Sequence, residues 1–89
     1  MSDPKPPVAD APPWSDGLTA YDRAHLTLYA RLLDAERASA SLSEVASLLF
    51  GIDAAAEPER AARVRDSHLR RARWMTDQGY RAMLKDGDR

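Results

Sequence analysis

The chain has 89 residues, a formal net charge of −1 and no cysteine. This length accommodates one small domain, and the lack of thiols excludes disulfide scaffolds, cysteine nucleophiles and thiolate zinc sites. No apolar run approaches the roughly 20 residues of a membrane span, and the first ten residues lack the pattern of a signal peptide. We therefore expect a soluble, cytoplasmic protein without a membrane partner.

The small net charge hides an uneven distribution. Residues 1–59 carry ten acidic and four basic side chains, whereas residues 60–89 carry nine basic and four acidic ones. Six arginines lie in residues 60–73, where Asp66 is the single acid. Such a run either contacts nucleic acid or forms an exposed helix face that the acidic half of the chain neutralises.

Proline, alanine and aspartate dominate the N-terminal segment. Five of the six prolines lie in residues 1–13, and Trp14 is the one large apolar group of the segment. Chains of this composition bury too little apolar surface to fold. We predict a disordered Pro-rich arm over residues 1–17, a helical domain over residues 18–85 and a frayed C-terminus over residues 86–89.

The first helix is predicted over residues 20–37, a run without glycine or proline. Thr19 is a favoured N-cap, and Asp22 follows three residues later, as in a capping box. At about 100° per residue, the apolar side chains form one face and a second stripe beside it. The second stripe, which either packs a further helix of the domain or binds a partner, is Leu26, Tyr29 and Leu33.

Two further helices follow. Ser41 to Glu44 form a capping box that starts a short helix, and Gly51 after Phe50 suits a left-handed helix end. A connection of about six residues leads to Pro58, which suits the first turn of a helix that runs to about residue 76. A last helical turn is predicted over residues 80–85, and no strand signal is present. The expected fold is all-α, with three to four helices.

The third helix carries most of the basic run. Its apolar stripe is Ala61, Val64, His68, Ala72 and Met75, and the wheel places Arg60, Arg63, Arg70, Arg71, Ser67 and Trp74 on the other side. A short capped helix, a connection and an arginine-bearing helix have the outline of a helix-turn-helix. Three carboxylates at the start of the third helix would repel DNA phosphates, and these belong to Asp53, Glu57 and Glu59.

The sequence offers little for catalysis. His25 and His68 are the only imidazoles; each lies on the apolar edge of its helix, where we interpret it as a hydrogen-bonded core residue. Neither has a second histidine or a cysteine at metal-ligand spacing, and no glycine-rich phosphate loop is present. We predict no enzymatic activity, no metal, no cofactor and no small-molecule substrate.

Three strings resemble a proteobacterial family, domain of unknown function 2285. They are LTAYDRAHLTLYARLLDAE (residues 18–36), LSEVASLLFGID (residues 42–53) and HLRRARWMTDQGYRAML (residues 68–84). The resemblance implies an extended-turn helix-turn-helix domain encoded on integrative and conjugative elements. Long members activate transcription by binding DNA, whereas short stand-alone members are QseM-like antiactivators associated with quorum sensing. The short chain is similar to the second kind.

Three hypotheses follow. In the main one the protein is an antiactivator that binds the N-terminal domain of a transcriptional activator and blocks excision and transfer genes of the conjugative element, through Leu26, Tyr29, Leu33 and Trp74. The alternative is a DNA-binding helix-turn-helix regulator that uses Arg60, Arg63, Arg70 and Arg71. The third is a homodimer formed through the stripe of the first helix.

Overall fold

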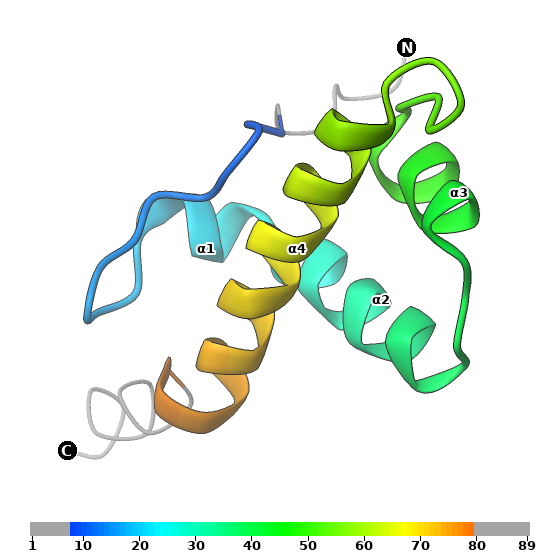
Figure 1. The fold of residues 1–89 in the computed structure, drawn as a ribbon. Coiled ribbons are helices and arrows are strands. Elements are labelled where there is room, and N and C mark those ends of the chain that lie inside the picture. The colour runs from blue at the N-terminus through cyan, green and yellow to red at the C-terminus, as the bar shows by residue number, and fades with distance from the viewer. Residues whose placement is uncertain (1–7, 80–89) are drawn as a thin grey trace, which may run out of the picture.

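The computed structural model describes residues 8–79. The regular structure in this range is helical throughout, which confirms the predicted all-α fold (Figure 1). The elements are α1 (Ala20–Ala24), α2 (Leu26–Arg37), α3 (Leu42–Val45), the π-helical turn η1 (Ala46–Phe50), α4 (Pro58–Trp74) and the π-helical turn η2 (Met75–Gly79). The turn predicted over residues 80–85, the frayed C-terminus over residues 86–89 and the start of the arm, residues 1–7, lie outside the described residues.

Helix α4 is the central element of the fold. In Figure 1 it runs diagonally, with α2 and α3 on one side and α1 and the N-terminal segment on the other. Its buried face meets α3, η1 and the turn after η1 in one apolar cluster. The buried members of the cluster are Ala46, Ile52, Ala61 and Val64. No helix within residues 8–79 is long and apolar enough to cross a bilayer.

The predicted signals at both ends of the second helix and at the start of the third are confirmed. The Ser41 hydroxyl accepts from the Glu44 N–H, and the Glu44 carboxylate accepts from the Ser41 N–H. Gly51 ends η1 in the left-handed conformation with φ of 66°. Pro58 begins α4, at a position where a backbone N–H would have no acceptor within the helix.

The connection between η1 and α4 is long and internally bonded. The carboxylate of Asp53 accepts from the Ala55 N–H at 2.9 Å, and its carbonyl accepts from the Glu57 N–H at 2.8 Å. Ile52 anchors the start of the connection in the core. The helix-turn-helix therefore has the extended turn that was expected.

The prediction of one continuous helix over residues 20–37 is wrong, because the helix is interrupted at His25. The capping box of Thr19 and Asp22 starts α1 as predicted. The His25 N–H then bonds the Asp22 carbonyl at 3.1 Å, while the His25 Nδ1–H donates to the Tyr21 carbonyl at 2.8 Å. In a continuous helix the Tyr21 carbonyl would accept from the His25 N–H. Here it accepts from the imidazole instead, so α1 ends and α2 starts at Leu26.

Candidate functional site

A fully buried group of polar side chains lies where the N-terminal segment, α1 and α4 meet. Arg71 and Asp22 are both 0% exposed and form an ion pair. Arg71 Nε lies 3.0 Å from Asp22 Oδ1, and Nη2 lies 2.6 Å from Oδ2. The same guanidinium donates to the carbonyls of Ser15 at 2.8 Å and Gly17 at 2.9 Å. Arg71 therefore joins α4 to α1 and to the segment before it, and we call this group the Arg71 clamp.

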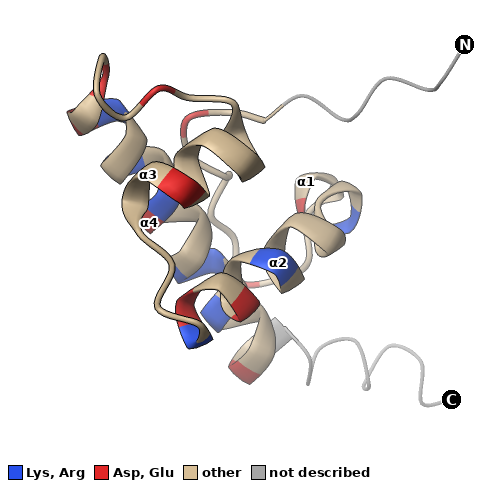
Figure 2. Ribbon diagram, turned by 90° about the vertical axis from the view of Figure 1, so that its right-hand side faces the viewer, with Lys and Arg blue, Asp and Glu red and all other residues tan. Residues whose placement is uncertain are grey.

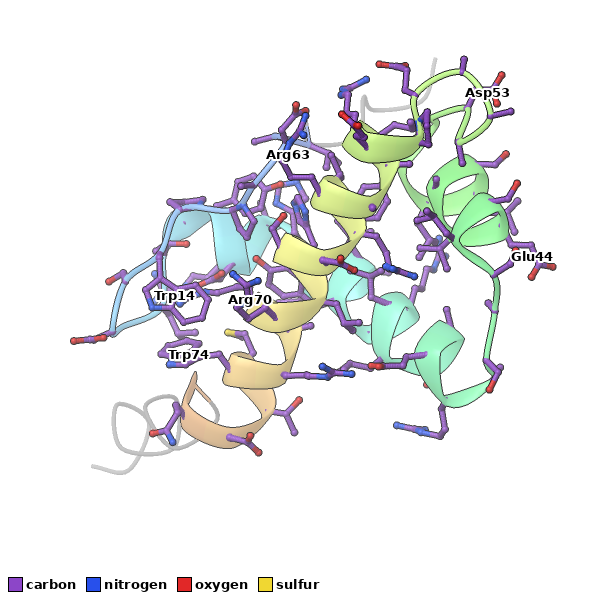
Figure 3. The ribbon with its side chains drawn as sticks, viewed as in Figure 1. Trp14, Glu44, Asp53, Arg63, Arg70 and Trp74 are labelled. Carbon is purple, nitrogen blue, oxygen red and sulfur yellow. The ribbon has the colours of Figure 1, made fainter. Side chains whose placement is uncertain are left out.

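Two tryptophans cover the clamp. The guanidinium carbon of Arg71 lies 3.8 Å from the ring centroid of Trp74 and 4.7 Å from that of Trp14. The two indoles meet edge to face with centroids 6.0 Å apart, as Figure 3 shows on the side of α4 next to the N-terminal segment. A cation over an indole face is attracted by the ring quadrupole. Trp74, expected to anchor a protein partner, thus packs on Arg71 of its own chain.

The clamp keeps Asp22 ionised. Burial by itself raises the pKa of this carboxyl, but hydrogen bonds from Arg71, from the Thr19 N–H and from the Tyr29 hydroxyl outweigh it and lower the pKa to about 2. Burial and the bond to Asp22 raise the pKa of the Tyr29 hydroxyl. At neutral pH the clamp is therefore an ion pair with a neutral phenol beside it.

Residues 8–17 lie against α4, although they were expected to belong to a disordered arm. Pro12 is buried, and Trp14 is held against Arg71 and Trp74 while 54% exposed. The physical reason is the donor capacity of Arg71: its N–H groups need acceptors, and the carbonyls of this segment supply two of them.

The partner-binding face expected on the first helix is not continuous. Tyr29 is 3% exposed and donates its hydroxyl hydrogen to Asp22 at 2.9 Å, so it belongs to the interior. Leu26 is exposed and Leu33 is half-buried, and Tyr29 between them is not available to a partner. A single helical wheel failed here because the helix is interrupted and because Asp22 attracts the phenol.

The two histidines are core residues, as interpreted from the sequence. His68 Nδ1–H donates to the Val64 carbonyl at 2.8 Å, and His68 Nε2 accepts from the Tyr21 hydroxyl at 2.6 Å. Burial lowers the pKa of His68, which favours the neutral ring that both bonds require. His25 is also buried. Within residues 8–79, no group of three or more His, Cys, Asp or Glu side chains could hold a metal ion.

Helix α4 presents arginines to solvent beside the clamp. Arg63 and Arg70 are exposed, and neither forms an ion pair with any residue that the structure describes. They are about two turns apart and share one face. In Figure 3 both lie on the side of α1 and the N-terminal segment, away from Glu44 and Asp53.

Arg60 extends this face by one turn, but its charge is already engaged. Its guanidinium contacts Asp10 at 3.2 Å and Glu57 at 3.3 Å. Of the four arginines considered for DNA, three therefore share one face of α4, and we call Arg60, Arg63 and Arg70 the α4 arginine face. The fourth, Arg71, is wrong as a DNA contact because it is fully buried in the clamp.

The start of α4 is acidic. Asp53, Glu57 and Glu59 are exposed there, and Figure 2 shows acidic residues along the turn that leads into the helix. A phosphate backbone that approached the first turn of α4 would meet these carboxylates, and like charges repel. An anion therefore meets less repulsion on the α4 arginine face than at these carboxylates.

A family model described as "T6SS, Transcription factor, DNA binding domain" matches residues 6–85. No curated protein matches the chain. The family match corrects the resemblance to domain of unknown function 2285. It also overturns the antiactivator hypothesis and its protein partner, since the matched family binds DNA. The short length and the acidic first two-thirds of the chain misled that hypothesis, because neither feature describes the local charge on α4.

Proposed function

The chain belongs to the RovC_DNA-bd family of T6SS transcription factor DNA-binding domains, and from this premise we propose that it is a DNA-binding transcriptional regulator. The contact is made by the α4 arginine face, with Arg63 and Arg70 foremost. The observation that carries the proposal is that these two exposed arginines have no ion-pair partner among residues 8–79.

The helix-turn-helix supports α4 as the element that enters the major groove. In this motif the second helix lies in the groove, and the first crosses the backbone. Arginine suits either contact, because its planar guanidinium pairs with two guanine acceptors or with phosphate oxygens. The acidic first turn of α4 favours an approach in which the middle of the helix, around Arg63 and Arg70, meets the DNA.

The proposed role requires no catalytic group, and the family is one of DNA-binding domains. A regulator of this kind acts where the chromosome is, so we place the protein in the cytoplasm. The family description also directs the choice of target, and duplexes from promoters of T6SS genes are the first to test.

Fluorescence anisotropy with a labelled promoter duplex tests the proposal. We expect micromolar or tighter binding at about 50 mM salt and a steep loss of affinity at about 200 mM, because bound arginines release counterions from DNA. Arg63→Ala and Arg70→Ala should each weaken binding and reduce the slope of log affinity against log salt by about one.

Arg37→Ala is the matched control. Arg37 is an exposed arginine at the end of α2 and carries the same charge. Figure 1 shows α2 on the other side of α4 from α1 and the N-terminal segment. Replacement of Arg37 should leave both affinity and salt slope close to the wild-type values. Equal losses in all three variants would mean that binding depends on net charge alone. No binding by the wild-type protein at low salt would overturn the proposal.

A further inference from the structure

The outer part of the N-terminal segment occupies one end of the α4 arginine face. Asp10 lies beside α4, and its two carboxylate oxygens accept from Arg60 Nε at 3.3 and 3.4 Å. Arg60 Nη2 donates to the same carboxylate at 3.2 Å. The Ser67 hydroxyl donates to the Asp10 carbonyl at 3.1 Å. One acidic residue thus uses two groups of α4 that flank Arg63.

The segment is held by two anchors of unequal strength. The inner anchor is the Arg71 clamp, which is buried and bonds Ser15 and Gly17. The outer anchor consists of exposed contacts. The Asp10 side chain, 51% exposed, meets an Arg60 side chain that is 41% exposed, and the Ala9 N–H donates to the Tyr21 hydroxyl at 3.1 Å. Exposed ion pairs contribute little free energy because water and salt screen them. Residues 8–10 can therefore exchange with solvent while residues 14–17 remain in place.

The carboxylate of Asp10 resembles a phosphate in the way it meets Arg60. Both groups are anionic, and both accept two N–H bonds from the edge of a guanidinium. Serine hydroxyls and arginines are common donors to the DNA backbone. Arg60 and Ser67 lie about one turn on either side of Arg63, so the same face offers donors to a phosphate on each side of it.

We propose that Asp10 is an internal competitor of DNA: it occupies a backbone-phosphate position formed by Arg60 and Ser67, and residues 8–10 leave α4 when DNA binds. This inference rests on the proposed function and adds a regulatory contact to the same site. Asp10 competes only weakly with DNA, because the exposed Asp10–Arg60 ion pair is easily displaced. Loss of Asp10 therefore raises DNA affinity about two- to fivefold.

The test compares Asp10→Asn with Asp16→Asn. Both substitutions remove one negative charge from the same segment, and Asp16 is exposed without an ion pair among residues 8–79. Anisotropy with the promoter duplex at fixed salt should show about two- to fivefold tighter binding for Asp10→Asn than for Asp16→Asn. Equal melting temperatures of the two variants would establish that both are folded.

A second pair of variants isolates the contact itself. In an Arg60→Ala background the competitor has lost its partner, so Asp10→Asn and Asp16→Asn should bind DNA equally. A persistent advantage of Asp10→Asn in that background would overturn the proposal, because the effect would then not pass through Arg60.

The outcomes separate this inference from the proposed function. If the wild type binds DNA and Arg63→Ala weakens it, but Asp10→Asn matches Asp16→Asn, only the competitor is refuted. Weaker DNA binding by Asp10→Asn than by Asp16→Asn would also refute the competitor proposal, because it would show that Asp10 supports DNA binding. If neither the wild type nor Asp10→Asn binds, both proposals fail together.

Discussion

Arg70 and Arg71 are neighbours in the chain and carry the same side chain, yet they occupy opposite environments. Arg70 is exposed and has no ion pair within residues 8–79, whereas Arg71 is fully buried against Asp22 and two indoles. The about 100° turn between consecutive helical residues separates them. A buried guanidinium must satisfy its charge within the protein, and an exposed one can offer its charge to a ligand. The basic run of α4 thus holds a buried arginine that the protein neutralises and an exposed one whose charge has no ion-pair partner among residues 8–79.

The largest expected effect comes from breaking the clamp. Arg71→Ala leaves the Asp22 carboxylate buried without a counter-charge and should lower the free energy of unfolding by about 3–5 kcal/mol. That is a large share of the stability of a small domain, so the variant should unfold at a much lower urea concentration than the wild type. Circular dichroism and urea denaturation measure it, with Arg70→Ala as the control one residue away. An Arg71→Ala variant with the same free energy of unfolding as Arg70→Ala would contradict the role of the clamp.

Acid should weaken the clamp without mutation. The pKa of Asp22 is lowered from 3.8 to about 2, so its stabilisation is complete above about pH 5 and is lost as the pH falls toward 2. The loss should amount to about 2 kcal/mol, and urea denaturation at several pH values would measure it. Asp22→Asn should lack this component of the pH profile, whereas Asp16→Asn should keep it. If the free energies of unfolding of wild type and Asp22→Asn changed in parallel with pH, ionisation of Asp22 would not be the cause of the acid sensitivity.

Removing one tryptophan should have a smaller effect. Trp14→Ala deletes one ring over the Arg71 guanidinium and the edge-to-face contact with Trp74. We expect the free energy of unfolding to fall by about 1 kcal/mol, since the ring is half exposed. Trp14→Phe keeps an aromatic face and should recover part of the loss. Urea denaturation of both variants checks this, and an unchanged Trp14→Ala would show that the indole does not hold the segment.

The smallest effect on stability belongs to the exposed arginines. Arg63→Ala and Arg70→Ala should change the free energy of unfolding by less than about 0.5 kcal/mol, because neither side chain has a partner to lose among residues 8–79. Thermal melts beside the DNA titrations would measure both quantities in the same samples. A strongly destabilised Arg63→Ala variant would assign the α4 arginine face to folding instead of DNA binding.

Helix ends were predictable because their signals are local. Ser41 and Glu44 bond each other within one turn, Gly51 accepts a positive φ without strain, and Pro58 fits where no N–H is needed. The interruption at His25 was not predicted, because helix propensities do not indicate that a histidine ring will bond a carbonyl of the preceding turn. The apolar stripe of α4 was predicted correctly at Ala61, Val64, His68 and Ala72, since burial follows the helical period.

The candidate site was predictable only in part. Arg63 and Arg70 were named from the wheel, and the structure places both on one exposed face. Asp10 and Ser67 were missed, although an acidic residue in a proline-rich segment ahead of an arginine-rich helix is a signal for contact between the two. Trp14 was noted as the one large apolar group of that segment, and this was the second available signal.

The sequence by itself determined an all-α domain, the limits of the helical segment over residues 42–50, the start of α4 and the extended turn between them, because these depend on residues close together in the chain. Only the tertiary structure decided which arginine is buried. The Arg71–Asp22 pair spans 49 positions, and it forms because the fold brings α1, α4 and the N-terminal segment together. Whether an arginine is buried depends on the groups that neutralise it and accept its hydrogen bonds. For Arg71 of α4 these groups come from α1 and from the N-terminal segment.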